Sequence, residues 1–148
     1  MEEEQPSLPL AFKEKIEQMK GVDVKLVIQK KLTMSDVKGD NSRFYIPIDK
    51  KIEESILLTP SERLSLNIYV PQKKRERLVG ISISMLDYNL KIWDDMYLKK
   101  WKMGKSEIYN ITGGWDKLVV ENYLEESQKI QLWSFRCNDS LNFALVNF

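Results

Sequence analysis

The fold is decided first by the stretch KKLTMSDV at residues 30–37, which is followed by SRFYIP at residues 42–47. A second stretch reads KKWKMGKSEIY at residues 99–109 and continues as ITGGW at residues 111–115. Each combines basic side chains, hydroxyl donors and a short irregular segment beside a strand-like run. These groups suit a protein that grips a phosphate backbone and reaches base edges. The two stretches together indicate duplex DNA as the ligand.

Strand patterns surround these two stretches. Apolar and polar residues alternate over residues 24–29, 64–70 and 78–86, a strand is expected at residues 43–46, and another begins near Leu90. The charged segment between the runs at 64–70 and 78–86 predicts a hairpin. Two apolar strands, at 130–135 and 141–146, are joined by the turn sequence CNDS at 137–140. Many short strands with few helices predict a largely β fold that closes its edges.

Three short helices are expected. Residues 8–20 form an amphipathic pattern that Gly21 stops, and Asp49 caps a helix over residues 50–57 in which Ile52 and Ile56 point inward. Thr112 is placed to cap the third helix. The apolar face of that helix is expected to hold Trp115, Leu118, Val119 and Tyr123.

The charge of the chain is informative only locally. The total is balanced, with 23 Lys and Arg against 22 Asp and Glu, so it does not identify a nucleic-acid binder. Residues 25–43 hold five basic side chains against two acidic ones, and residues 99–105 hold four lysines and no acid. Phosphate contacts depend on local charge, so a neutral protein can still present a basic face.

The cysteine count and the hydropathy pattern bear on the compartment. A lone Cys137 cannot form an internal disulfide, which fits a reducing compartment. The sequence contains no apolar run long enough for a membrane span, and its N-terminus is acidic, unlike a signal peptide. We therefore expect a nuclear or cytosolic protein without membrane contact. The basic cluster at residues 73–77 is either a solvated hairpin loop or a nuclear signal.

Enzymatic chemistry is disfavoured by the residue types present. The chain has no histidine, which removes the usual triads, the Cys-His pair and nearly all zinc sites. The adjacent acids Asp94-Asp95 and Glu125-Glu126 point in different directions on a strand or helix. Thr112-Gly113-Gly114 is too short for a phosphate loop, because no Gly-Lys-Ser/Thr follows. We expect no catalytic residue, no metal and no cofactor.

Four motifs in this order resemble the plant B3 DNA-binding domain family: K-x-L-T-x-S-D-V, S-R-F-Y-I-P, W-x(4)-S-x-x-Y-x-x-T-x-G-W, and L-W-S-F-R at residues 132–136. The resemblance runs from about Val24 to the C-terminus. It implies a mainly β (α+β) fold, a seven-stranded open β-barrel of the B3 pseudobarrel type with two short flanking helices. Residues 23–148 would form the DNA-binding domain, after an acidic disordered tail and a short amphipathic helix in residues 1–22.

The resemblance also implies a grip on the major groove by two arms. The implied DNA-binding residues are Lys31, Thr33, Ser35, Lys38, Asn41 and Arg43 in the first arm, and Lys100, Trp101, Lys102, Lys105 and Ser106 in the second. The lysines and hydroxyls would meet phosphate, and Asn41 or Arg43 would reach base edges. Trp101 would contact sugar or a thymine methyl, or pack locally. Asp36 is expected to order its own loop by accepting hydrogen bonds.

The expected function is sequence-specific binding of double-stranded DNA by a transcription regulator in a plant nucleus. Two alternatives stay open. A B3-like fold can serve as a protein interaction module with weak or no DNA binding, docking through the helix at residues 8–20 or a sheet edge. A metal-dependent nuclease is the other. The sequence does not determine the oligomeric state.

Overall fold

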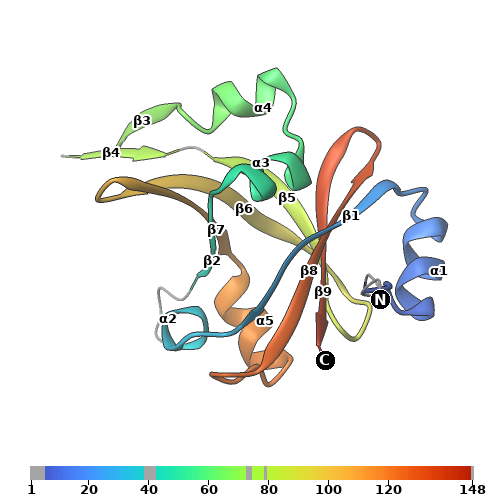
Figure 1. The fold of residues 1–148 in the computed structure, drawn as a ribbon. Coiled ribbons are helices and arrows are strands. Elements are labelled where there is room, and N and C mark those ends of the chain that lie inside the picture. Colours follow the sequence, from blue (N-terminus) through green and yellow to red (C-terminus); the bar gives the residue numbers. More distant parts are fainter. Residues whose placement is uncertain (1–5, 39–42, 73–74, 79, 148) are drawn as a thin grey trace.

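Seven strands form one mixed sheet that curls into a nearly closed barrel (Figure 1). Their spatial order is β1 (Val22–Lys31), β8 (Lys129–Cys137), β9 (Ser140–Asn147), β5 (Ile81–Leu86), β6 (Ile92–Met103), β7 (Ser106–Gly113) and β2 (Phe44–Pro47). Neighbouring strands are antiparallel except β5 and β9, which run parallel. The computed structural model describes residues 6–38, 43–72, 75–78 and 80–147. The predicted seven-stranded open barrel is confirmed.

Alternate residues of the strands fill the interior of the barrel. Phe44 and Ile46 of β2, Leu98 of β6 and Ile111 of β7 are all fully buried there. Period-two burial of this kind follows from the pleat, which sends successive side chains to opposite faces. Met96 of β6 and Tyr109 of β7 belong to the same core. The positions between these core residues, such as Tyr45, Lys99 and Asn110, therefore point to the outside of the barrel.

Two helices cover parts of the barrel interior. These are α3 (Lys50–Ile56) and α5 (Trp115–Glu121). In α3, the Asp49 carboxylate accepts a hydrogen bond from the backbone N–H of Ile52 at 2.8 Å, and Ile52 and Ile56 are buried, as predicted. A side-chain oxygen at this position satisfies one of the N–H groups that a helix leaves open.

A second apolar cluster lies on the outside of the barrel. The helix α1 (Leu10–Gln18) packs there, and its Phe12 and Ile16 meet Trp133 and Phe135 of β8. The predicted amphipathic helix is thus present, and its apolar stripe covers the outer face of the β8–β9 hairpin (Figure 1).

The start of α5 differs from the prediction. Thr112 lies within β7, and the position before the helix is taken by Gly114, which makes no side-chain cap. Gly113 has a φ of 89°, and a Cβ there would lie 2.5 Å from the carbonyl oxygen of Asp95. Only glycine fits so close to a neighbouring backbone. Tyr123 was expected on the buried face, but it follows the end of the helix and is 86% exposed.

Two further helices were not predicted. One is α2 (Met34–Val37), in the first arm. The other is α4 (Pro60–Ser65), which replaces the first part of the strand expected over residues 64–70. Thr59 and Glu62 exchange hydrogen bonds at its start, and this pairing stabilises a helix. A hairpin follows, but not the one predicted: β3 (Tyr69–Gln72) pairs with β4 (Arg75–Leu78), which lies in the charged segment expected as a loop. The strand expected over residues 78–86 is β5, which pairs with β6 and β9.

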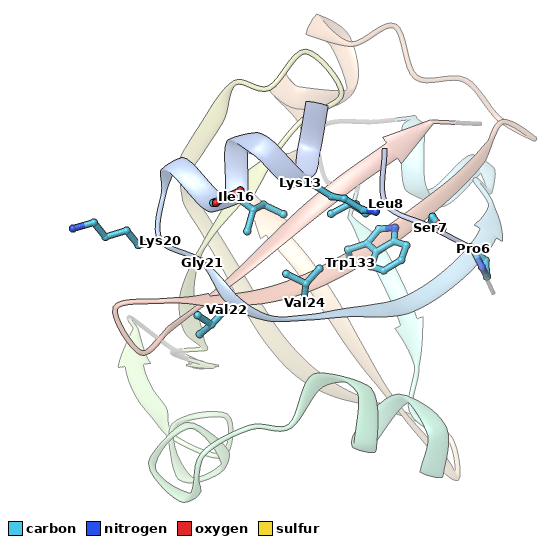
Figure 2. Close-up of a pocket in the computed structure, with 11 residues that line it drawn as sticks. Pro6, Ser7, Leu8, Lys13, Ile16, Lys20, Gly21, Val22, Val24 and Trp133 are labelled. Atoms are coloured by element: carbon cyan, nitrogen blue, oxygen red, sulfur yellow. The ribbon is translucent and has the colours of Figure 1, made fainter. Parts of the chain in front are cut away.

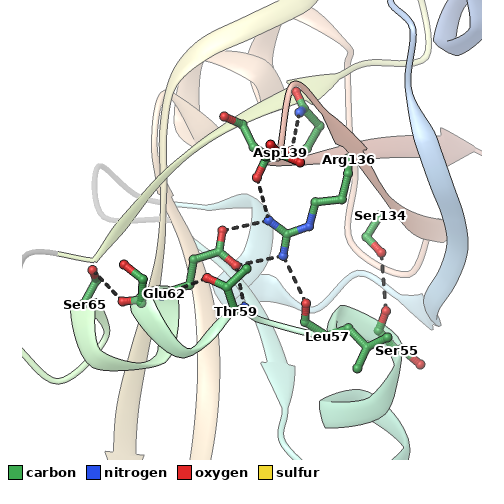
Figure 3. Close-up of polar contacts among 11 residues, drawn as sticks. Ser55, Leu57, Thr59, Glu62, Ser65, Ser134, Arg136 and Asp139 are labelled. Atoms are coloured by element: carbon green, nitrogen blue, oxygen red, sulfur yellow. Dashed lines mark hydrogen bonds and ion pairs between the residues drawn. The ribbon is translucent and has the colours of Figure 1, made fainter.

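Arg136 fastens α4 to the barrel (Figure 3). Its guanidinium donates to both carboxylate oxygens of Glu62 at 2.8 Å, and also to the carbonyl oxygens of Leu57 and Asp139. The two charged side chains are only 15% and 16% exposed. Two-point pairing of this kind is stronger than an ordinary surface ion pair.

Replacing Glu62 by Gln is expected to lower the free energy of unfolding by about 2 kcal/mol at pH 7, because charged hydrogen bonds are lost. Burial alone raises the pKa of Glu62, but hydrogen bonds from Arg136 and Thr59 outweigh it and hold the pKa below the ordinary 4.5. The stabilisation is therefore present above pH 4.5 and is lost as the pH falls through the folded-state pKa. Urea unfolding of both proteins at pH 7, 5 and 3 measures this.

The matched control is Glu54→Gln, at an exposed position of α3. It should change the unfolding free energy by less than about 0.5 kcal/mol. A difference between wild type and Glu62→Gln that stays constant down to pH 3 would contradict the role given to this carboxylate.

Candidate nucleic-acid interface

The two edge strands of the sheet, β1 and β2, are joined by a polar seam. The ammonium of Lys30 on β1 donates to the carbonyl oxygen of Tyr45 on β2 at 2.9 Å and forms an ion pair with Asp36 at 3.0 Å. The Asp36 carboxylate also accepts from the backbone N–H of Tyr45 at 3.3 Å. The barrel is thus closed at this end by side chains in place of a strand ladder.

Asp36 also organises the first arm. Its carboxylate accepts from the backbone N–H of Thr33 at 2.7 Å and from the Thr33 hydroxyl at 3.0 Å. Its carbonyl oxygen accepts from the indole N–H of Trp115 at 2.7 Å. The predicted loop-ordering role of Asp36 is therefore confirmed. The hydroxyl hydrogen of Thr33 points to Asp36, so in this conformation Thr33 has no side-chain donor to offer a phosphate.

Lys30 is a structural cation. Its ammonium lies 3.9 Å from the ring centre of Tyr45 and 4.4 Å from that of Phe44. Burial lowers the pKa of Lys30 below its ordinary value, and the charge and hydrogen bond of Asp36 oppose that shift. Lys30 was not among the predicted DNA-binding residues, and these contacts give it a role in holding β1, α2 and β2 together.

The first arm presents its other polar side chains to solvent. Lys31 ends β1, Ser35 lies on α2 and Lys38 follows α2, and all three are exposed. Asn41 lies outside the described residues. Lysines and a serine along one exposed segment offer the donors that phosphate oxygens accept.

The second arm is the tip of the β6–β7 hairpin. Gly104 takes a left-handed φ of 62° at its turn, and Lys102, Lys105 and Ser106 are exposed around it. Lys100 is tied to Glu107 by an ion pair of 2.9 Å. The hydrogen bond from Lys100 lowers the pKa of Glu107, so this acid stays charged at neutral pH. Glu107 therefore partly neutralises the base of the arm, while the lysines nearer the tip extend beyond it.

Arg43 of the first arm contacts Trp101 of the second. The guanidinium carbon of Arg43, just before β2, lies 4.1 Å from the ring centre of Trp101 on β6. Stacking of a guanidinium on an indole is favourable, and it fixes the planes of both groups. Both side chains are half-buried. The structure thus brings together residues from the two predicted arms.

The arms lie on the side of the barrel away from α1 (Figure 1). Alternation along the strands puts Tyr45, Lys99 and Asn110 on the outer face between them, since their neighbours Phe44, Leu98 and Ile111 fill the core. Sequence reasoning missed these three as part of the surface. Period-two alternation could have identified them as outward-facing, once the adjacent residues had been assigned to the core.

Other kinds of site are not indicated in the described part of the chain. No group of three or more metal-ligating side chains occurs among these residues. None of their helices has the length and apolarity required to cross a bilayer. Cys137 is half-buried, and its thiol donates to the carbonyl oxygen of Met19 at 3.0 Å.

A separate groove lies beside α1 (Figure 2). Its volume is about 570 Å³, and its lining includes Ile16, Val22, Val24 and Trp133. Val22 and Val24, on the edge strand β1, are 58% and 40% exposed. This groove is the surface that the alternative of a protein interaction module would use.

The barrel with two basic arms on one side defines a B3 domain. The chain belongs to the family of At2g31720-like B3 domain-containing proteins, whose model matches residues 3–148. This family assignment confirms the resemblance derived from the four sequence motifs.

Relatives in Arabidopsis thaliana include the putative B3 domain-containing protein At3g49610, which is 33% identical over 86% of this chain and 40% of the relative. B3 domain-containing protein At1g05920 is 37% identical over 84% of this chain and 40% of the relative. The chain thus spans about two fifths of the length of these curated relatives.

Two solved structures share the fold. The Arabidopsis FUS3–DNA complex matches with a TM-score of 0.50 and 20% identity, over 83% of this chain and 96% of that chain. The complex of the Arabidopsis thaliana transcription factor LEC2 with DNA matches with a TM-score of 0.50 and 19% identity, over 84% and 93%.

Proposed function

We propose that this B3 domain binds the major groove of duplex DNA with its two arms, as a sequence-specific transcription regulator in a plant nucleus. The observation that carries the proposal is the Arg43–Trp101 stack, which joins residues of the two arms into one surface. The related structures of FUS3 and LEC2 are complexes with DNA, which supports the choice of ligand.

The charge of this surface supports the same ligand. Within the described ranges, Lys31, Lys38, Lys102 and Lys105 are exposed and form no ion pair with an acid. Each can neutralise a phosphate and release a counterion, which is the main source of affinity that does not depend on sequence. Ser35 and Ser106 add neutral donors that can fix the register.

Specificity for the DNA sequence is assigned to fewer side chains than the phosphate contacts are. Arg43 can leave the indole to reach a guanine edge, and Asn41 suits adenine. Trp101 offers an apolar face to a sugar or a thymine methyl. The mechanism involves no bond making or breaking and requires no cofactor.

The experiment that tests the proposal is fluorescence anisotropy of a labelled mixed-sequence duplex, titrated with the protein at several salt concentrations. A plot of log K against log salt with a slope of about −4 or steeper is expected, since each neutralised phosphate contributes roughly −0.9. No binding at low salt, by protein shown to be folded, would contradict it. Plasmid that stays intact with magnesium present would dispose of the nuclease alternative.

A second function is proposed for the groove beside α1. Val22 and Val24 leave apolar surface open there, and the described lining carries Lys13 and Lys20 against one acid, Glu17. A protein segment with apolar side chains and acidic flanks fits this lining. Selection from a displayed random-peptide library should enrich such peptides on wild type and not on Val22→Asp/Val24→Asp. Equal enrichment on both proteins would count against this function.

A further inference from the structure

Asn110, in the middle of β7, is a buried amide that has no hydrogen-bond partner in the described part of the chain. Its side chain is completely buried, and among residues 6–38, 43–72, 75–78 and 80–147 neither its nitrogen nor its oxygen finds a hydrogen-bond partner. Burial of an amide that has lost its water and gained no partner is unfavourable, and such groups in folded proteins require an explanation. An apolar residue would fill the same place without this cost.

The position of Asn110 is central to the surface between the arms. It lies opposite Tyr45 on β2 and opposite Lys99 on β6. Its chain neighbours Tyr109 and Ile111 belong to the barrel core, so the amide points to the outer face. The neighbouring outward positions on β2 and β6 are those of Tyr45 and Lys99.

The Arg43–Trp101 stack crosses this position. Trp101 pairs with Ile108, which precedes Asn110 by two residues. Tyr45 pairs with Asn110, and Arg43 precedes Tyr45 by two residues. In this antiparallel register, Arg43 and Trp101 therefore lie on opposite sides of Asn110. A contact of 4.1 Å between the guanidinium and the indole therefore spans the row that holds Asn110. The stack is therefore placed to cover the amide, and it consists of two side chains that the proposed function assigns to DNA.

We propose that Asn110 is a reader of adenine that the Arg43–Trp101 stack covers in the free protein. This inference rests on the proposed function. When the arms engage a duplex, Arg43 moves from the indole to the DNA and the amide is uncovered. Both amide atoms lack partners, so the group that satisfies them must offer an acceptor and a donor together. The major-groove edge of adenine does so with N7 and the N6 amino group, whereas a phosphate offers acceptors only.

The first test uses Asn110→Leu, which keeps the size of the side chain and removes its polar atoms. After a preferred site is selected from a random duplex pool with wild type, the variant should bind that site about 10- to 100-fold more weakly, as loss of a two-point adenine contact implies. Binding to an unrelated duplex should be unchanged. The thermal midpoint of the variant should rise, because an unpartnered buried amide has been removed.

The second test changes the DNA. Each adenine of the selected site is replaced in turn by 7-deaza-adenine, which lacks the N7 acceptor. One replacement should weaken wild-type binding and leave Asn110→Leu unaffected. The control variant is Asn142→Leu, since Asn142 is a buried asparagine of β9 whose amide already donates to Ser140. It should leave DNA binding unchanged.

The outcomes separate the two proposals. If wild type binds the selected site and Asn110→Leu binds it equally well, the role of Asn110 is overturned and the proposed function stands. If wild type binds no duplex, the proposed function fails and this inference fails with it. Should Asn110→Leu not fold, the Asn110 side-chain amide resonances of wild type decide: they should shift when the selected duplex is added, and unchanged resonances would overturn the inference.

Discussion

Reversing the charges of Lys31 and Lys102 together is expected to weaken binding to any duplex on the order of 60-fold at about 0.1 M salt. Each lost phosphate contact removes about 0.9 from the salt slope, which corresponds to nearly a factor of ten at that concentration. The two residues lie in different arms and both are exposed. Anisotropy of Lys31→Glu/Lys102→Glu against wild type, over a range of salt, measures the affinity and the loss of slope together.

The matched control reverses two lysines beside α1, as Lys13→Glu/Lys20→Glu. Both double variants change the net charge from +1 by the same four units, so a general charge effect would weaken both equally. Only the variant in the arms is expected to lose most of its affinity. Because α1 lies on the other side of the barrel (Figure 1), equal losses would show that the arms are not the site. Peptide binding at the α1 groove should survive the reversal in the arms.

Replacing Asp36 by Ala is expected to destabilise the fold by about 3–5 kcal/mol, the range found when one partner of a buried ion pair is removed. The carboxylate is fully buried, while the side chain of its partner Lys30 is 12% exposed. Its loss leaves the Lys30 ammonium uncompensated and also removes the acceptor for the N–H groups of Thr33 and Tyr45. Urea denaturation at pH 7 measures the change.

The control for this prediction is Asp94→Ala. Asp94 is exposed on β6 and accepts one hydrogen bond from the hydroxyl of Ser84, so about 1 kcal/mol or less is expected. The double variant Lys30→Met/Asp36→Ala should recover part of the loss, because the stranded charge is gone. If Asp36→Ala lowers the free energy of unfolding by less than about 1 kcal/mol, as the control does, the stabilising role given to the polar seam is contradicted.

The β class of the fold was predictable from short strands and distinctive turn residues, whereas the seven-stranded barrel was what the family resemblance implied. The turn of the β8–β9 hairpin places Asn138 and Asp139 at φ values of 52° and 66°, and these residue types tolerate that conformation. The Asp49 cap was predictable for a similar reason, since a carboxylate before an apolar helical pattern marks a start.

The helix α4 and the end of α5 were predicted wrongly because two sequence patterns overlap in each segment. Leu64 and Leu66 alternate with polar residues and so imitate a strand, but Thr59, Pro60 and Glu62 form a helix start that overrides the alternation. Tyr123 follows the helical spacing of Trp115 and Val119, yet α5 ends at Glu121 and Tyr123 takes a φ of 52°. A hydrophobic period does not say where a helix stops.

The site was predictable only as two separate segments. Motif order assigned the lysines and Trp101, but the contact between Arg43 and Trp101 depends on how the β6–β7 hairpin lies against β2. The unpartnered amide of Asn110 is likewise a property of packing. No local pattern reveals that a polar side chain is covered by residues distant in the sequence.

The central claim, that DNA binds between the arms, is tested most directly by the four tryptophan indole N–H resonances of the nitrogen-15-labelled protein. Trp101 lies in the second arm, whereas the indole N–H of Trp133 donates to Gln131 beside α1. On addition of a duplex, the Trp101 resonance is expected to shift most and the Trp133 resonance to stay in place. A shift of Trp133 with an unchanged Trp101 would contradict the claim and place the ligand on the α1 side.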